Sequence, residues 1–212
     1  MRDRLAGLVL FLPVPIVLWL FTRFPLGVRA SLALGVLLVV THRLYARPFG
    51  LARAERRCLW CGGAARDGPV VAIEEPLGLT RWRACTSGHA DALARVLGFA
   101  ERHAVGLRVG ILGALALFLP AALLADARRL GSLTVLDATA FFRLAIAVTV
   151  LPLGWLSGRA ERAAAEAARV PFPVHIQALI GTRAVLWLFR LVGLLWLGMG
   201  VRHVATRAGL WP

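Results

Sequence analysis

The sequence predicts an all-α integral membrane bundle of about five helices, with a small metal-binding domain inserted between the second helix and the third. Composition is the first observation, because the 212 residues are 59% hydrophobic and have a mean hydropathy of +0.74. The second is a series of long apolar segments separated by arginine-rich stretches. The third is that all three cysteines lie within residues 58–85, in the longest part of the chain without membrane-like character.

Residues 1–45 are expected to form a hairpin of the first two membrane helices. The segment 5–21 is apolar and no small-residue cleavage site follows it, so we expect a retained span rather than a signal peptide. Two prolines inside this segment predict a kink. The second segment, 28–45, has a clean apolar part of only residues 30–40, so it is either a full span or a re-entrant or interfacial helix.

Two pairs of metal ligands organise residues 46–103, which we expect to be a cytoplasmic metal-binding domain with a linking helix. Cys58 and Cys61 are three positions apart. Cys85 and His89 follow, four positions apart. Zinc prefers four nitrogen or sulfur ligands in a tetrahedron, and a short pair places two of them on one tight turn. The spacing therefore predicts a zinc site made of these four side chains.

The segments around the ligands have the pattern of a small zinc finger. Residues 70–73 and 79–84 are expected to be short strands, separated by a turn that contains proline and glycine. Thr86 or Ser87 can cap a helix that begins near His89. A cysteine turn, a hairpin and a ligand-bearing helix in this order resemble a treble-clef or zinc-ribbon finger. The resemblance covers about thirty residues and implies a fold, not an activity.

A structural zinc ion is the favoured interpretation, because four protein ligands close the tetrahedron and leave no open position for chemistry. A redox dithiol at Cys58 and Cys61 is one alternative, although no thioredoxin-like βαβ pattern surrounds it. An iron–sulfur centre with three cysteines and one histidine is another. Haem attachment is disfavoured, because Gly62 rather than a histidine follows the first cysteine pair. Plain buried cysteines are the remaining alternative, and the paired spacing disfavours them.

Residues 104–212 are expected to supply three further spans and a cytoplasmic helical extension at residues 159–182. The three spans are residues 104–125, 133–156 and 184–201. The amphipathic helix that begins near His89 is expected to continue into the first of them. Alanine and charged residues over 159–170 predict a water-exposed helix, which two prolines then end.

The charge of the chain predicts its orientation. The 25 basic residues are all arginine, and the net charge is +14. In a five-span topology, sixteen arginines lie on the side of the metal domain and six on the other side. The positive-inside rule therefore predicts a cytoplasmic metal domain on a bacterial-type inner membrane, where reducing conditions also suit metal-bound thiolates. Because these arginines flank apolar segments, we expect contact with lipid headgroups and none with nucleic acid.

Three ionisable residues are candidates for a function inside the membrane. Arg143 and Arg190 lie within predicted spans, and Asp137 is the nearest acidic residue to Arg143. A charge in hydrocarbon is costly, so each should face the bundle and have a partner. They either bind an anionic lipid or solute, or have a structural role through pairing with backbone carbonyls.

Four histidines lie near the ends of the predicted spans: His42, His103, His175 and His203. The first three belong to the cytoplasmic side of the five-span topology. Haem would require histidine pairs that face each other deeper in the bundle, so interfacial histidines are the favoured interpretation.

The chain lacks HExxH, P-loop, GxSxG and dinucleotide-binding motifs, so the sequence leans against an enzyme and predicts no catalytic residue. We expect an accessory, assembly or docking subunit of a membrane complex. Its partners would be the lipid bilayer and either other membrane subunits or a second copy of the chain. The alternatives are a membrane enzyme or transporter for a lipid or anionic solute, and a metal or redox sensor.

Overall fold

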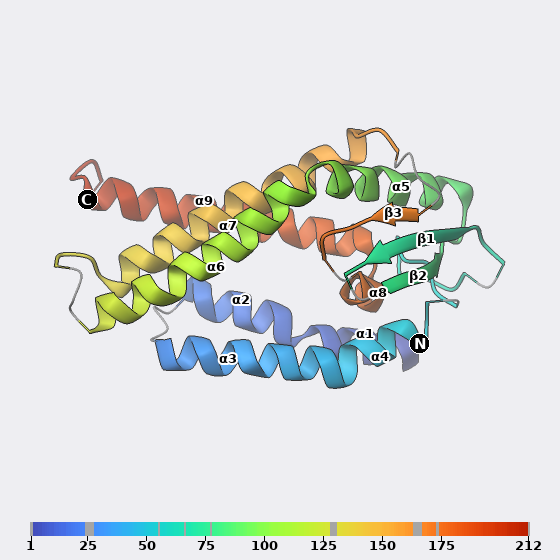
Figure 1. Cartoon of the computed structure of the whole chain (residues 1–212), viewed down its shortest axis with the longest axis horizontal. Helices are drawn as coiled ribbons and strands as arrows, with labels where there is room; N and C mark the ends of the chain where they lie inside the picture. The colour runs from blue at the N-terminus through green and yellow to red at the C-terminus, as the bar shows by residue number, and fades with distance from the viewer. Residues whose placement is uncertain are drawn as a thin grey trace.

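The computed structural model describes residues 2–23, 28–54, 56–65, 67–76, 78–127, 131–162, 167–172 and 174–211. A long helical bundle forms most of the molecule (Figure 1). A small domain of strands and shorter helices lies at one end of this bundle and carries the cysteines. We call it the metal domain. It consists of the cysteine-bearing loop with β1 (Val70–Glu75), β2 (Gly78–Arg83), β3 (Ala167–Arg169), α5 (Ser87–Arg102) and α8 (His175–Ile180).

Three long helices form the bundle: α6 (Ala104–Asp126), α7 (Val135–Leu156) and α9 (Thr182–Arg207). α7 lies between the other two and packs against both. The core of the bundle contains one large aromatic side chain from each helix: Phe118, Phe142 and Trp196. Burial of these rings holds the three helices together at this layer of the bundle.

Among the described residues, four helices are long and apolar enough to cross a membrane. They are Leu32–Leu51, Ala104–Asp126, Val135–Arg159 and Thr182–Arg207. The first apolar helix, Leu5–Val17, is shorter than a bilayer span requires. Of the five spans expected, the described residues therefore support four long apolar helices, and the first expected span is a shorter apolar helix.

The first apolar segment is divided where its prolines begin. α1 (Arg2–Phe11) ends before Leu12, and α2 (Pro13–Arg23) begins at Pro13. Proline has no backbone N–H to continue the helix, and its ring crowds the preceding turn. The predicted kink is confirmed, and it divides the segment into helices of 10 and 11 residues.

The second apolar segment extends beyond its predicted end. α3 (Val28–Thr41) passes into a π-helical turn, η1 (His42–Ala46), and then into α4 (Arg47–Leu51). These elements together give the helix Leu32–Leu51, of which little is fully buried. It contacts α6 lightly through α3, and its end at α4 packs against residues 175–180. A π-helical turn inside a helix is frequently found at a functional site, and His42 begins this one.

The metal domain has the predicted order of cysteine turn, hairpin and helix. β1 (Val70–Glu75) pairs antiparallel with β2 (Gly78–Arg83), and α5 (Ser87–Arg102) follows. The hydroxyl of Thr86 accepts the N–H of His89 at 3.2 Å, which confirms Thr86 as the cap of this helix. The core of the domain includes Leu59, Ile73, Trp82, Leu93, Leu97 and Val174.

The predicted water-exposed helix over residues 159–170 is wrong for the residues that the structure describes there. A 3-10 turn, η2 (Ser157–Arg159), is followed by β3 (Ala167–Arg169), which pairs parallel with β1 in a sheet of order β2-β1-β3. Alanine favours a helix by less than about 1 kcal/mol per residue. Pairing with β1 and burial of Ala168 in the domain core outweigh that preference. Within the described part of the expected extension 159–182, α-helix is found at α8 (His175–Ile180) and in the first residue of α9.

The helix that carries His89 does not continue unbroken into the bundle. α5 ends at Arg102 and α6 begins at Ala104, with His103 between them at φ −103° and ψ 18°. Leu107, in the first turn of α6, packs into the core of the metal domain. The domain and the bundle are therefore joined by packing as well as by the chain.

The two ends of the bundle hold different segments of the chain (Figure 1). The N-terminus, the metal domain and the start of α9 lie at one end. The C-terminus, the end of α6 and the start of α7 lie at the other. The arginine-rich segments that the sequence assigns to the cytoplasm thus share one end of the molecule.

Candidate metal centre

The four predicted ligands converge on one point, and we call them the Cys/His cluster. The sulfur atoms of Cys58, Cys61 and Cys85 and a ring nitrogen of His89 lie within 4.8 Å of one another. Nδ1 of His89 is 3.6 Å from Sγ of Cys58 and 2.9 Å from Sγ of Cys85. Sγ of Cys61 and Sγ of Cys85 are 3.7 Å apart. Cys58 and Cys61 lie in the loop before β1, Cys85 follows β2, and His89 lies in the first turn of α5.

These separations suit a tetrahedral ion. Bond lengths of about 2.3 Å to sulfur and about 2.0 Å to nitrogen place neighbouring ligand atoms roughly 3.5–3.8 Å apart. The separations of 3.6 and 3.7 Å agree with that geometry, and the contact of 2.9 Å is shorter. Three sulfurs and one imidazole nitrogen form a donor set that binds d-block metals. The cluster is therefore compatible with a metal site.

Backbone hydrogen bonds fix the turn that carries the first cysteine pair. The N–H of Gly62 donates to the carbonyl of Cys58, and the N–H of Cys58 donates to the carbonyl of Gly63, both at 2.8 Å. Gly62 has φ +68°, a conformation that glycine adopts without steric cost. The N–H of Leu59 donates to the carbonyl of Arg83 at 2.9 Å and so joins this turn to β2.

The thiols of the cluster differ in acidity. Burial raises the pKa of Cys58. Hydrogen bonds from the backbone N–H groups of Cys61 and Cys85 and from the His89 ring lower this pKa by more, so that the net value is about 7. Burial and the two neighbouring thiols raise the pKa of Cys85 to about 12. Three thiols this close do not all ionise without a compensating cation, so a metal ion would supply the charge that makes all three thiolates.

The turn of residues 58–63, which we call the metal-binding turn after its predicted ligands Cys58 and Cys61, lies against the start of α9. The N–H of Thr182 donates to the carbonyl of Leu59 at 2.8 Å, and the N–H of Arg183 donates to the carbonyl of Trp60 at 3.0 Å. The first N–H groups of a helix have no partner within the helix, so the turn satisfies them. The buried hydroxyl of Thr182 donates to the same Leu59 carbonyl at 3.0 Å.

Gly181 permits this close approach. Its φ is +94°, and a Cβ atom at this position would lie 2.8 Å from the carbonyl oxygen of Trp60 and 2.8 Å from the nitrogen of Gly62. Glycine alone fits both the backbone conformation and the space. The Cys/His cluster and the last long helix are therefore parts of one packed unit.

The two candidate intramembrane arginines differ in exposure, because Arg190 is half-buried and Arg143 is buried. Nε of Arg190 donates to the carbonyl of Gly154 at 2.7 Å, in the last turn of α7, where carbonyls have no partner within the helix. Its guanidinium also lies 5.1 Å from the ring centre of Trp155 and 4.7 Å from that of Trp187. Arg143 is only 9% exposed and lies within the bundle.

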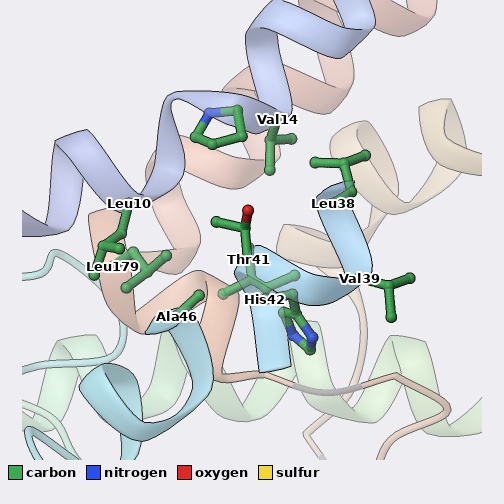
Figure 2. A pocket seen from close by; sticks show the side chains of 10 residues that line it. Leu10, Val14, Leu38, Val39, Thr41, His42, Ala46 and Leu179 are labelled. Atoms are coloured by element: carbon green, nitrogen blue, oxygen red, sulfur yellow. The ribbon is translucent and has the colours of Figure 1, made fainter. Parts of the chain in front are cut away.

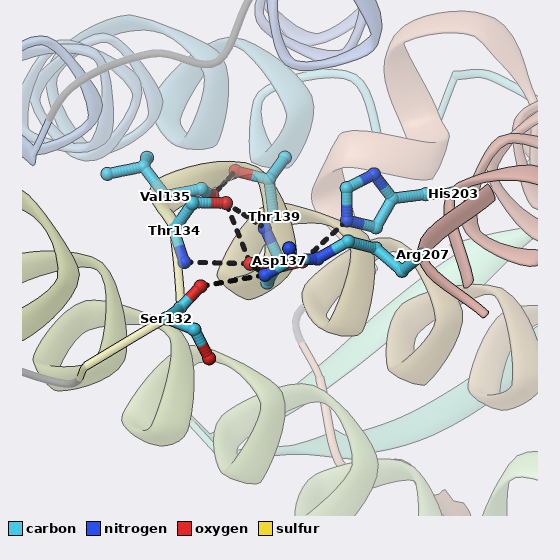
Figure 3. A network of polar contacts seen from close by, with 7 residues as sticks. All are labelled: Ser132, Thr134, Val135, Asp137, Thr139, His203 and Arg207. Carbon is cyan, nitrogen blue, oxygen red and sulfur yellow. Dashed lines mark hydrogen bonds and ion pairs between the residues drawn. The ribbon is translucent and has the colours of Figure 1, made fainter. Parts of the chain in front are cut away.

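Asp137 lies near the start of α7 and pairs with α9 rather than with Arg143 (Figure 3). Its carboxylate lies 2.8 Å from Nε2 of His203 and accepts hydrogen bonds from Arg207 at 3.0 and 2.8 Å. It also closes a capping box with Thr134 at the N-terminus of α7. Asp137 therefore holds the C-terminal end of α9 against the beginning of α7.

Sequence reasoning missed a buried polar cluster where the metal domain meets η1. The structure brings Nε2 of His42 into contact with Nε2 of His175, and Glu75 lies behind His175. The predicted topology already assigns both histidines to one side of the membrane, which is the signal that favours such a pair. Glu75 has no comparable signal, because a carboxylate at the end of a strand is usually exposed.

No protein-family model matches the chain, and no curated protein or solved structure matches it significantly. The features of this chain that bear on its function are therefore the Cys/His cluster, the long apolar helices and the distribution of charge.

Proposed function

We propose that this chain is an integral inner-membrane protein whose Cys/His cluster binds a structural zinc ion, and that it acts as an accessory, assembly or docking subunit of a membrane complex. The observation that carries this proposal is the hydrogen-bonded contact between the metal-binding turn and the start of α9. Four protein ligands leave zinc no coordination position for a substrate. A metal bound there stabilises the domain and fixes it to the bundle.

The helices and the charge support the location. Four helices match a bilayer in length and apolar composition. Sixteen of the 25 arginines belong to segments on the side of the metal domain, which favours a cytoplasmic position for that domain. A reducing compartment would keep its thiols available for metal.

The helix Leu32–Leu51 supports a docking role. It is barely buried within the chain, and its exposed apolar side chains include Val36, Leu37, Val39 and Leu44. A spanning helix that packs so lightly on its own bundle leaves a face for lipid and for the helices of another subunit or a second copy.

The contacts of Asp137 and Arg190 support structural roles for these residues. Asp137 is engaged by His203 and Arg207, and Arg190 by a backbone carbonyl and two indole rings. A solute site in the membrane would need polar groups left for its ligand. The alternative of an enzyme or transporter that uses these two residues therefore has less support than a subunit role.

Elemental mass spectrometry of detergent-purified protein tests the metal assignment. We expect Cys61→Ser to contain one zinc ion per chain fewer than the wild type, with no visible absorption band in either sample. Cys61 is exposed, so this variant retains more of the domain core than a substitution at buried Cys58 would. Iron with a visible band, or equal zinc in both proteins, would contradict a structural zinc site at the cluster.

Cross-linking in native membranes followed by mass spectrometry tests the subunit role. We expect cross-links from the helix Leu32–Leu51 to another membrane protein or to a second copy of the chain. A chain that yields no such cross-link and purifies as a monomer by light scattering would contradict the docking proposal, whatever its metal content.

A further inference from the structure

Three polar side chains from distant segments meet where η1 contacts the metal domain. His42 comes from η1, His175 from the first residue of α8, and Glu75 from the last residue of β1. The side chains of His175 and Glu75 are only 1% and 3% exposed. Buried ionisable groups are costly unless they are paired, so this arrangement needs a compensating interaction.

Glu75 lies beside the His175 ring and is itself held by hydrogen bonds. Its carboxylate accepts a hydrogen bond from the Thr80 hydroxyl at 2.8 Å and one from the N–H of Val174 at 3.3 Å. Two donors directed at one carboxyl group suit the ionised form. Oε2 of Glu75 lies 3.8 Å from Nδ1 of His175. The carboxylate therefore favours a proton on Nδ1, which leaves a lone pair on Nε2 that can coordinate a cation.

Nε2 of His175 meets Nε2 of His42. The ring centres are 4.3 Å apart and the rings are inclined by 33°. Two imidazole lone pairs directed at one another would repel, and either a proton or a metal cation between the two nitrogens removes that repulsion. A carboxylate behind a histidine is the arrangement that commonly orients a metal-binding imidazole, because it fixes the tautomer and raises the basicity of the coordinating nitrogen.

A cavity adjoins this pair. It has a volume of about 250 Å³, and His42 lies at its edge beside Thr41 and Ala46, among aliphatic side chains such as Val14 and Leu38 (Figure 2). An ion held by two imidazoles has unfilled coordination positions. His42 lines this cavity and His175 does not, so a small ligand in the cavity would approach the ion from the His42 side. The Cys/His cluster, in contrast, is closed by four protein ligands.

We propose that His42 and His175 form a second metal site, which binds a d-block cation with an affinity for imidazole, is oriented by Glu75 and is open toward the neighbouring cavity. Zinc, copper and nickel belong to this class. The site does not depend on the function proposed above, because none of its residues belongs to the Cys/His cluster. Arg43 and Arg47 lie close enough for their positive charges to act on His42, so coordination by the two imidazoles has to outweigh this repulsion of a cation.

Metal counts on the full chain in detergent test this proposal. The protein is loaded with Zn(II), desalted and analysed for all d-block elements by elemental mass spectrometry. We expect two ions per chain in the wild type and one in His42→Gln, which substitutes a half-buried side chain. His103→Gln is the matched control, since His103 also lies at the end of a long helix, and it should retain both ions.

The pattern across variants distinguishes this site from the Cys/His cluster. Cys61→Ser should lose one ion and retain the other, and the combination of Cys61→Ser with His42→Gln should lose both. Glu75→Gln should weaken Zn(II) binding to the second site by about 10- to 100-fold and leave the first site unchanged. One ion per chain in the wild type, or an unchanged count in His42→Gln, would overturn the proposal and leave a shared proton as the cation between the two rings.

Discussion

Helix α9 is held at its two ends by different kinds of contact. At its start, the backbone N–H groups of Thr182 and Arg183 donate to carbonyls of the metal-binding turn. At its other end, His203 and Arg207 contact the carboxylate of Asp137, whose side chain is 14% exposed. The first contact depends on the path of a backbone turn, and the second depends on the charge of one side chain.

This difference makes the two ends separable. In the function proposed above a metal ion fixes the turn, so its loss should release the start of α9 while the Asp137 contacts remain. Removal of the Asp137 charge should loosen the far end while the metal domain remains folded. A small domain built on a three-stranded sheet gains much of its stability from such a metal ion, because its own apolar core is limited.

The substitution Cys58→Ser should produce the largest difference in stability between the two ends of α9. Cys58 is fully buried, and the binding energy of a structural metal in a small zinc domain, about 10 kcal/mol or more, is folding energy. We expect loss of one zinc ion per chain and loss of amide hydrogen-exchange protection at Thr182 and Arg183. Protection near Arg207 should persist, as measured by hydrogen-exchange mass spectrometry.

Ser87→Ala is the control for this substitution, because Ser87 lies close to the cluster in sequence and is not one of its ligands. It should retain the metal and the protection at both ends of α9. Equal loss of protection at both ends in Cys58→Ser would show that the two ends are not separable.

The substitution Gly181→Ala should have the next largest effect, because it attacks the contact without removing a ligand. The new Cβ would lie 2.8 Å from backbone atoms of the metal-binding turn, at a residue with φ +94°. We expect destabilisation by about 2–4 kcal/mol, measured by thermal unfolding in detergent. Gly198→Ala, also in α9, has open space at its Cβ and should be neutral or slightly stabilising. Equal melting temperatures would mean that the turn and α9 are not in close contact.

The substitution Asp137→Asn should act on the opposite end. It keeps a side chain that can cap α7 but removes the charge that binds Arg207 and His203. We expect a loss of about 1–2 kcal/mol and faster hydrogen exchange near Arg207, with zinc content unchanged. Asp126→Asn, at the same end of the bundle in an exposed position, should have no measurable effect. A fall in zinc content of Asp137→Asn would couple the two ends.

The substitution Arg190→Lys should have the smallest effect. Arg190 lies within α9, between the two ends of this helix. Lysine lacks the Nε donor that reaches the Gly154 carbonyl and the planar group that lies over the two indoles. We expect a loss of about 0.5–1 kcal/mol in the thermal unfolding assay, relative to exposed Arg202→Lys. A loss several times larger would give Arg190 a role beyond these contacts.

Local patterns in the sequence determined the ligand set, the hairpin and the cap of α5. Each depends on residues close together in the chain: two ligand pairs on short turns, alternating strand residues and a threonine before a helix. The long apolar helices are equally local signals, since length and hydropathy are read over a single segment. The break at Pro13 follows from the chemistry of one residue type.

Only the tertiary structure decided which distant segments meet. β3 replaces an expected helix because the edge of β1 is available to pair with Ala167–Arg169. Asp137 contacts Arg207, seventy positions away, because α7 and α9 lie side by side. His42, Glu75 and His175 converge from three elements that have no common periodicity. Propensity and spacing describe the chain over a few turns, whereas these contacts depend on the free energy of packing the whole molecule.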